Sequence, residues 1–419
     1  MNFTNRIWEM GELSTYAKPA QLVVVYGRRR VGKTSLITNW MTTKQGHFSQ
    51  AIEGSPHLQI SQLCQDLGPL LNSQIQPKNW IQFFELLEKS IEKRAVLCLD
   101  EFPYLVESDP TLPSIMQRFL DHSKNKKIGW IISGSSQKMM NSIFLNHSSP
   151  LFGRAHRVLK IEPMTYVDFC SACSLKKTDM ENFVKYSMVG GLPKYWEAVN
   201  SAMHPIELAD LLYFDRGALL ENEPRRILSD EKVDGITPLS VLEAIGRGSH
   251  KPSEISSRIG LKQNSLAKVF SQLIDTSLIE RQIPFGASEK NSKKTLYKIS
   301  DPMLNFWYSV FSGLRTQWQH KTEAEKNEVL RLFASHVFEN EARKTLKGQR
   351  YWQGDLEIDC IQKKDKNSIA LYEIKFSKLK NREREQIEKD LHKKGQSSKL
   401  SKDWQIESSN AYDWTDYSK

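Results

Sequence analysis

The chain has 419 residues, of which 39% are hydrophobic and 26% are charged, and its formal net charge is +10. This length is enough for about three domains, and the composition is that of a globular protein with a polar surface. No apolar run approaches the ~20 residues of a membrane-spanning helix, which excludes an integral membrane protein. Residues 1–6 lack the apolar core of a signal peptide, so we expect a cytoplasmic protein.

The positive charge favours a polyanionic partner, and DNA is the partner that we expect. A homo-oligomer or a protein partner is left open. The five cysteines are odd in number and scattered, which predicts reduced thiols rather than a disulfide framework. Cys170 and Cys173 form one C-x-x-C with no second pair near them, so two structural cysteines are favoured over a zinc or redox site.

The first predicted elements surround a glycine-rich loop. A helix from Arg6 to Tyr16 leads into the apolar, β-branched run Gln21–Tyr26, which is typical of a buried parallel strand. The loop Gly27–Thr34 reads G-x-x-x-x-G-K-T, and a helical pattern follows from Ser35. Strand, loop and helix in this order aim backbone N–H groups and a helix N-terminus at phosphate oxygens. A plain glycine turn after a strand is the alternative.

The loop residues divide by chemistry. Gly27 and Gly32 allow the backbone to wrap closely because they carry no Cβ. Lys33 is expected to reach the β- and γ-phosphates, and the Thr34 hydroxyl to bind Mg²⁺. The predicted cofactors are therefore ATP and Mg²⁺. The expected nucleotide contacts are Gly27, Arg28, Arg29, Arg30, Val31, Gly32, Lys33, Thr34 and Ser35.

Two further apolar runs end in polar side chains. Ala95–Leu99 is followed by Asp100 and Glu101. Asp100 suits an outer-sphere contact to Mg²⁺, and Glu101 is placed to orient an attacking water, which makes Glu101 and Lys33 the catalytic candidates. The run Ile128–Ile132 precedes Ser133-Gly134-Ser135. We expect either that a serine hydroxyl of this segment senses the γ-phosphate or that the segment is a simple turn.

The segments between these strands predict helices. A second strand is expected near His47–Ile52, and Trp80–Lys93 repeats apolar residues at helical spacing. Another helix is expected near Leu112–His122. Strands that alternate with helices predict an α/β domain over residues 1–163, with a parallel sheet covered on both faces.

The start of the chain, Phe3-x-Asn5-Arg6-x-x-Glu9, together with the loop resembles the archaeal-type P-loop ATPase family, which is AAA+/STAND-like. The resemblance implies that Asn5 and Arg6 contact the nucleotide near its adenine. A surface polar pair is the alternative.

The resemblance also covers Gly153-Arg154, which precedes a strand at Val158–Ile161. It implies that Arg154 acts as an arginine finger toward its own or a neighbouring subunit's nucleotide, whereas a structural arginine is the alternative. From 164 to 232 the pattern is helical, and Val189–Trp196 resembles a G-G-x-P-x-Y element of the family's helical lid. The same residues also work as a plain helix break.

Residues 233–302 predict a winged helix. Its helices are expected at Thr237–Gly246, Pro252–Ile259 and Lys262–Asp275, and its hairpin strands at Leu278–Phe285 and Thr295–Ser300. This region contacts DNA or acts as an inert spacer. The candidate DNA-contacting residues are Lys262, Gln263, Asn264 and Lys268 on the third helix and Lys290, Lys293 and Lys294 at the hairpin tip.

Residues 303–400 contain a second acidic arrangement. Strands are expected at Leu356–Ile361 and Ile369–Phe376, and if facing residue numbers sum to 732, Asp359 lies opposite Glu373. Two such carboxylates repel each other, and a divalent metal would relieve that repulsion. Lys375 lies on the same face as Glu373 because side chains alternate along a strand.

With a helix over Glu328–Leu346, this arrangement resembles the PD-(D/E)XK nuclease fold. The resemblance implies that Glu339, Asp359 and Glu373 are metal-side acids and that Lys375 is catalytic, with Glu341 as the alternative helical acid. Residues 401–419 are predicted to be a polar, poorly ordered tail.

The sequence therefore predicts an ATP-hydrolysing switch coupled to a DNA-directed, nuclease-like C-terminal domain. The alternative is a signalling or scaffold ATPase whose nuclease fold binds DNA or protein without cleaving. A transcription regulator acting through the winged helix is a third interpretation.

Overall fold

The computed structural model describes residues 3–44, 46–71, 76–123, 126–233, 235–288 and 294–418. The chain divides into two compact units. The first contains Met1–Met164, Leu192–Lys194 and Ile227–Val233, and the second contains Thr165–Gly191, Tyr195–Arg226 and Asp234–Lys419. Among the described residues, no helix combines the length and the apolar character needed to cross a bilayer.

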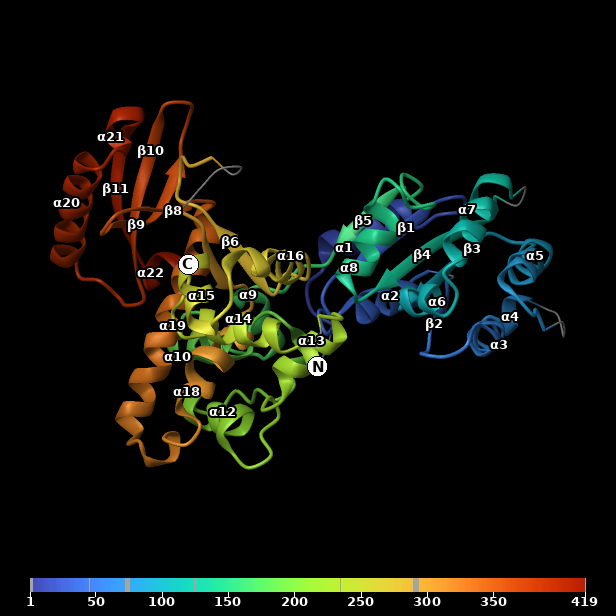
Figure 1. Ribbon diagram of the computed structural model, residues 1–419, viewed down its shortest axis with the longest axis horizontal. Helices are drawn as coiled ribbons and strands as arrows, with labels where there is room; N and C mark the ends of the chain where they lie inside the picture. Colours follow the sequence, from blue (N-terminus) through green and yellow to red (C-terminus); the bar gives the residue numbers. More distant parts are fainter. Residues whose placement is uncertain are drawn as a thin grey trace. The chain divides into compact units, whose positions relative to one another are not determined.

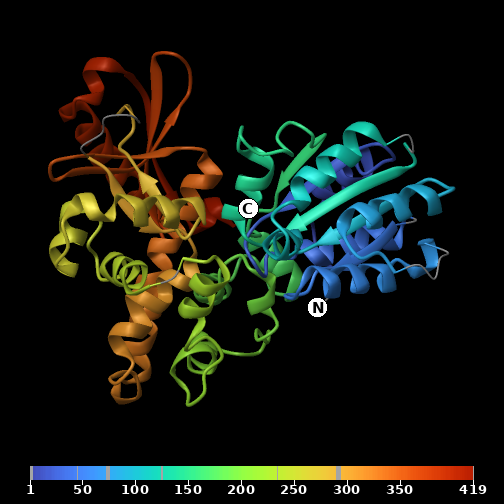
Figure 2. The ribbon, with the colours of Figure 1, turned by 45° about the vertical axis from the view of Figure 1, so that its right-hand side comes forward.

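A parallel five-stranded sheet with the order β2-β3-β4-β1-β5 forms the centre of the first unit (Figures 1 and 2). Its strands are β1 (Leu22–Tyr26), β2 (Gly46–Gln50), β3 (Ala95–Asp100), β4 (Ile128–Gly134) and β5 (Arg157–Lys160). Every pair of neighbouring strands is parallel. The predicted α/β fold with a parallel sheet is therefore confirmed for this part of the chain.

Helices cover the two faces of this sheet. They are α1 (Ile7–Tyr16), α2 (Lys33–Thr42), α3 (Pro56–Asp66), α4 (Gly68–Leu71), α5 (Trp80–Ser90), α6 (Phe102–Ser108), α7 (Leu112–His122), α8 (Gln137–Met140) and the π-helical turn η1 (Asn141–Leu145). On β1, Leu22 and Val24 belong to a core cluster that includes Trp80 of α5 and Met116 of α7. The alternate residue Val23 is also fully buried, so both faces are covered.

The second unit begins with helices. They are α9 (Tyr166–Ala172), α10 (Met180–Val189), α12 (Pro205–Ala209), the π-helical turn η2 (Asp210–Phe214), α14 (Ile236–Gly246), α15 (Pro252–Ile259), the 3₁₀ turn η3 (Gln263–Leu266), α16 (Ala267–Asp275), α17 (Pro302–Phe306), the π-helical turn η4 (Trp307–Phe311), α18 (Ser312–Leu314) and the 3₁₀ turn η5 (Trp318–His320). Two more helices, α11 (Pro193–Trp196) and α13 (Glu223–Asp230), carry residues of both units.

Helices α14, α15 and α16 are followed by an antiparallel hairpin of β6 (Ile279–Gln282) and β7 (Leu296–Ile299). This is the predicted succession of three helices and two strands. Of the residues proposed to contact DNA, Lys262, Gln263, Asn264 and Lys268 are exposed. Lys290 and Lys293 lie outside the described residues, so the predicted basic tip is only partly covered by the structure.

A four-stranded sheet with the order β11-β10-β9-β8 ends the chain (Figure 1). Its elements are α19 (Glu323–Leu346), β8 (Gln349–Gln353), β9 (Leu356–Lys363), β10 (Ser368–Lys375), α20 (Asn381–Ser397), α21 (Leu400–Asp403), β11 (Gln405–Asp413) and α22 (Trp414–Tyr417). Strands β8, β9 and β10 are antiparallel, whereas β11 is parallel to β10. Cys360 faces Tyr372 and Ile361 faces Leu371, so the predicted register sum of 732 is confirmed.

The prediction of a poorly ordered tail is wrong for residues 401–418, and Lys419 lies outside the described residues. Strand β11 pairs with β10 from Ser368 to Lys375, and Trp414 has none of its surface exposed. The indole Nε1 of Trp414 donates a hydrogen bond to the Thr178 oxygen at 3.1 Å, and its ring packs against Phe338 and Phe376. The segment is polar because only one face of β11 is buried, which a composition argument does not detect.

Candidate functional site

The glycine-rich loop connects β1 to α2. Gly32 has a φ of 94°, in the left-handed region, and it caps the first turn of α2 at Lys33. A Cβ on Gly27 would lie 2.5 Å from the Ile161 oxygen, so a side chain does not fit there. Both glycines are therefore required by the backbone, one for its conformation and the other for a close approach.

The ammonium of Lys33 lies inside this loop. The side chain is 5% exposed, and its Nζ donates to the Gly27 oxygen at 2.9 Å and to the Arg28 oxygen at 3.0 Å. Burial lowers the pKa of Lys33, while Glu101 and Asp100 act against that shift. A buried cation with acidic neighbours at the start of a helix favours a polyphosphate ligand.

Arg6 contacts the same loop from outside. It is 7% exposed, and its Nη2 donates to the Val31 oxygen at 3.0 Å and to the Glu162 oxygen at 2.8 Å. Its Nη1 pairs with Glu9 at 2.8 Å. Arg6 is therefore not a surface residue, because it supports the backbone of the loop. Asn5 is exposed and has a φ of 57°.

The tip of β3 brings Asp100 to the loop. Asp100 is fully buried, and its Oδ2 accepts a hydrogen bond from Thr34 Oγ1 at 2.7 Å. Its Oδ1 accepts from the Glu101 backbone N–H at 3.1 Å and from the Ser133 hydroxyl. The carboxylate is thus fixed by groups from the loop helix, from the residue after β3 and from β4.

Glu101 follows with a φ of 53°, a left-handed conformation that turns its side chain toward β4. Its Oε2 accepts from the Ser135 hydroxyl at 2.8 Å and from the Ser135 N–H at 3.1 Å. The two serines at the end of β4 therefore hold the two acids. The sequence left open whether a serine here senses phosphate or forms a simple turn. In the structure Ser135 holds the Glu101 carboxylate.

These residues fit a magnesium ion. Mg²⁺ prefers oxygen ligands and binds proteins through one or two side chains together with phosphate oxygens. Thr34 and Asp100 supply such oxygens within 2.7 Å of each other at the phosphate loop. Thr34 and Asp100 are therefore the residues that would hold the ion, Thr34 through its hydroxyl and Asp100 through an outer-sphere contact.

The loop arginines differ in position. Arg28 is 6% exposed, whereas Arg29 is exposed and forms an ion pair with Asp230. Arg30 has a φ of 69°. Val31 is fully buried and Ser35 is exposed.

Arg154 belongs to the Gly153-Arg154 motif, and its side-chain nitrogens bind groups outside the loop. Its Nε and Nη2 donate to the two carboxylate oxygens of Asp121 at 3.0 and 2.7 Å, and its Nη1 donates to the Pro150 oxygen at 2.8 Å. This bidentate pair favours the structural interpretation of Arg154 within its own chain.

One residue near the loop was missed by the sequence analysis. Glu231 follows α13 and is 3% exposed, with Arg28 and Lys33 as its cationic neighbours. Burial raises the pKa of Glu231 to about 7, against the effect of those two cations. The segment Ser229-Asp230-Glu231-Lys232 resembles any exposed helix end, so only tertiary structure identifies it.

The second predicted acidic site is only partly assembled. Lys375 Nζ donates to Glu373 Oε1 at 2.8 Å, and Asp359 Oδ2 accepts from the Ile374 N–H at 2.8 Å. Burial and the neighbouring Glu373 raise the pKa of Asp359 to about 6. Among the described residues, no three His, Cys, Asp or Glu side chains are spaced to hold a metal ion. The three predicted acids do not fit a resident metal in this arrangement.

The structure separates the two helical acids of α19. Glu339 lies near Asp359, which it affects electrostatically, and near Arg343, with 4.0 Å between its Oε2 and Arg343 Nη1. Glu341 pairs with Lys344 at 2.7 Å, and its charge helps to raise the pKa values of Tyr186 and Tyr417, after the larger effect of their burial. Glu339 is therefore the acid on the side of the strands.

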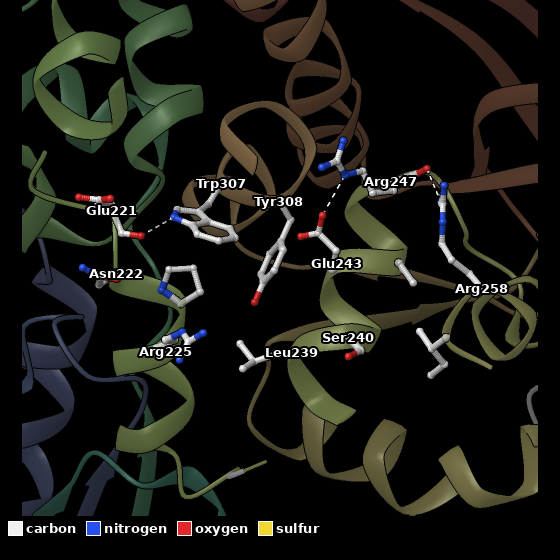
Figure 3. A pocket seen from close by; sticks show the side chains of 13 residues that line it. Glu221, Asn222, Arg225, Leu239, Ser240, Glu243, Arg247, Arg258, Trp307 and Tyr308 are labelled. Atoms are coloured by element: carbon white, nitrogen blue, oxygen red, sulfur yellow. Dashed lines mark hydrogen bonds and ion pairs between the residues drawn. The ribbon is translucent and has the colours of Figure 1, made fainter. Parts of the chain in front are cut away.

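A cavity of about 650 Å³ lies in the second unit (Figure 3). The rings of Trp307 and Tyr308 line it with centroids 4.8 Å apart and planes at 71°. The Tyr308 hydroxyl is buried without a hydrogen-bond partner among the described residues. The charged residues of the lining are Glu221, Arg225, Glu243, Arg247 and Arg258. No sequence motif predicted this cavity.

Known proteins resemble this chain at two levels. Residues 3–199 match the family described as an ATPase domain predominantly from Archaea. An uncharacterized protein of Methanocaldococcus jannaschii is 30% identical over 397 residues, which cover 89% of this chain and 87% of that protein.

A Walker-type ATPase of Pyrococcus abyssi has the same fold, with a TM-score of 0.52 and 16% identity over 74% of this chain and 96% of the other. The loop, the buried lysine and the acids at the strand end lie inside the matched region. The chain therefore belongs to the archaeal-type family of P-loop ATPases.

Proposed function

We propose that the protein is a Mg²⁺-dependent, ATP-hydrolysing switch. The observation that carries this proposal is the contact between Thr34 Oγ1 and Asp100 Oδ2, which joins the phosphate loop to the end of β3. Lys33 binds the β- and γ-phosphates, and the loop N–H groups bind the remaining phosphate oxygens. The magnesium ion supplies charge neutralisation of the phosphates when it is bound.

Glu101 is proposed to orient the water that attacks the γ-phosphorus. Both hydrogen bonds from Ser135 use Oε2, so Oε1 is the oxygen that faces the water. The bond between the attacking oxygen and phosphorus forms as the bond to the β–γ bridging oxygen breaks, and the proton that the water loses passes to Glu101. The products are ADP and inorganic phosphate.

ATP turnover measured with Mg²⁺ and with EDTA tests this proposal. We expect hydrolysis with Mg²⁺ that disappears in Lys33→Ala, because the loop loses the only ammonium that reaches the phosphates. Asp121→Asn, which removes a charge at the Arg154 pair, serves as a control. Equal turnover in the lysine variant and the wild type would refute the site.

A second candidate function concerns the C-terminal domain. We propose that residues 303–418, with the winged-helix-like helices before them, bind DNA or another polyanion, with the nuclease-like arrangement as a further candidate. The exposed Lys262 and Lys268 support DNA contact. The acids are already paired, Glu373 with Lys375 and with Lys394 at 3.7 Å, which favours binding without cleavage.

Plasmid assays separate the two versions of this candidate. Nicking of supercoiled DNA in Mg²⁺ or Mn²⁺ that disappears in Lys375→Ala would support a nuclease. DNA binding that is unchanged in Lys375→Ala, without nicks, would support a binding module. Turnover of ATP measured with and without DNA reports whether the two parts are coupled.

A further inference from the structure

Three consecutive residues at the end of α13 contact the phosphate loop and its surroundings. Asp230 forms an ion pair with Arg29 of the loop, and Lys232 forms an ion pair with Glu107 at the end of α6. Glu231, between them, is 3% exposed and belongs with them to the first unit. We call residues Asp230–Lys232 the acidic latch.

The carboxylate of Glu231 lies among groups that also surround a nucleotide's phosphates. Arg28 and Lys33 are its cationic neighbours, Asp230 is its anionic neighbour, and the Gln137 backbone N–H donates to it just beyond Ser135. Its Oε2 is buried and has no hydrogen-bond partner among the described residues. A carboxylate in this position is held by cations rather than by water, and one of its oxygens is left unsatisfied.

We propose that Glu231 is a nucleotide-sensing residue that competes with phosphate for Lys33 and Arg28, so that nucleotide binding releases the acidic latch. This inference rests on the proposed ATP-binding function and adds its regulation. A triphosphate brings several negative charges to the same two cations, and like charges at short range in a buried site repel strongly. The carboxylate then loses the attraction of the two cations, while the unfavourable free energy of keeping a charge away from water remains.

Release of the acidic latch can be measured by hydrogen exchange of its backbone amides. The backbone N–H groups of Glu231, Lys232 and Val233 donate to the oxygens of Ile227, Ser229 and Leu228 at 3.0, 3.1 and 2.9 Å. These bonds close the end of α13, and they depend on the latch staying in place. Release exposes these amides to exchange with solvent.

Nucleotide affinity of full-length variants gives the first test. Glu231→Gln keeps the shape of the side chain and removes the charge that it carries above its pKa of about 7, so at pH 8 Mg²⁺·ATPγS is expected to bind at least about 10-fold more tightly than to the wild type. Glu92→Gln removes a charge from an exposed position of the same unit and is expected to leave affinity within about 2-fold, because exposed charges are screened. Equal affinities of the two variants would overturn the latch.

Hydrogen exchange of the wild type gives the second test, and it does not depend on a substitution. Mg²⁺·ATPγS is expected to accelerate exchange at residues 231–233 of the wild type, whereas in Glu231→Gln, which has no charge for the phosphates to repel, the nucleotide is expected to leave exchange at these residues unchanged. Slower or unchanged exchange on binding would overturn the latch and leave the proposed ATPase standing. A wild-type protein that binds neither ATPγS nor ADP would overturn the proposed function and the latch together.

Discussion

Thr34 Oγ1 donates a 2.7 Å hydrogen bond to Asp100 Oδ2, although the two residues are 66 positions apart in the chain. Thr34 lies in the first turn of α2, the helix after the phosphate loop, and Asp100 ends strand β3. In a parallel sheet the carboxyl ends of the strands meet at one edge, which is where ligands bind. This contact therefore defines the candidate site, and its consequences can be tested.

The first prediction concerns Asp100. Asp100→Asn keeps a hydrogen-bond acceptor for Thr34 but removes the negative charge that a hard cation prefers. We expect ATP affinity to lose its dependence on Mg²⁺, measured as the ratio of Kd values with Mg²⁺ and with EDTA. A ratio equal to that of the wild type would show that another group holds the ion.

The second prediction concerns Glu101. Glu101→Gln is expected to bind ATP normally and to hydrolyse it at least ~10²-fold more slowly, on the scale of losing a general base. Single-turnover assays of bound nucleotide separate the two effects. Ser135→Ala, which removes one of the two donors to Glu101, should reduce turnover less. Wild-type turnover in Glu101→Gln would assign the water to a different residue.

The third prediction is a pH dependence of stability caused by Glu231. Its pKa is about 7 in the folded protein and 4.5 as its ordinary value, so the folded state binds an extra proton between these pH values. The stabilisation of the folded state by this protonated carboxyl group is present in full below about pH 4.5. It is lost as the pH rises to about 7, and the free energy of unfolding falls by at most about 3 kcal/mol.

The control for that effect is the same protein without the ionisable group. The difference in unfolding free energy between the wild type and Glu231→Gln, measured by urea denaturation at several pH values, cancels the other titrating residues. We expect the wild type to fall relative to the variant from pH 5 to pH 7.5. A difference that is constant with pH would contradict the raised pKa.

The fourth prediction concerns Asp359. Its carboxylate is buried beside Glu373, so Asp359→Asn relieves repulsion while its side-chain oxygen still accepts from the Ile374 N–H. At pH 8 we expect a gain of about 1–2 kcal/mol, measured by denaturant unfolding. The exposed Asp355 in the adjoining turn provides the matched control, Asp355→Asn, which should be neutral. A destabilised Asp359→Asn would mean that the charge stabilises the sheet.

The fifth prediction concerns the end of the chain. Trp414→Ala removes a fully buried ring from the aromatic cluster and the hydrogen bond to the Thr178 oxygen, and is expected to cost about 3–5 kcal/mol. Trp404→Ala, at a partly exposed ring, should cost less. Thermal unfolding of both variants measures the difference. If both variants lost little stability and by the same amount, the end of the chain would not be packed as the structure shows.

Much of the fold follows from local pattern. The run Leu22–Tyr26, the loop glycines and the acids after Leu99 predicted a parallel sheet with a phosphate loop, because strand burial and glycine geometry depend on neighbours in sequence. The hairpin register of β9 and β10 was also predictable, since a short polar tip fixes which residues face each other.

Other features escaped local pattern. Polar residues 401–419 form a strand because β10 supplies a partner along its whole length. Arg154 is the arginine of the Gly153-Arg154 motif. Its Nε and Nη2 nevertheless donate hydrogen bonds to Asp121, which lies 33 positions away in sequence. In each case the decisive partner is distant in the chain, so composition and spacing carry no signal for it.

The amino-acid sequence by itself determined which residues form the candidate nucleotide site, because Lys33, Thr34, Asp100 and Glu101 are each set by a short motif. Only the tertiary structure decided what surrounds them: the serines that hold the acids, the arginine that supports the loop and the acidic latch at Glu231. The physical reason is that motifs specify backbone conformation and functional groups locally. Burial and electrostatic neighbours arise only when segments far apart in the chain pack together.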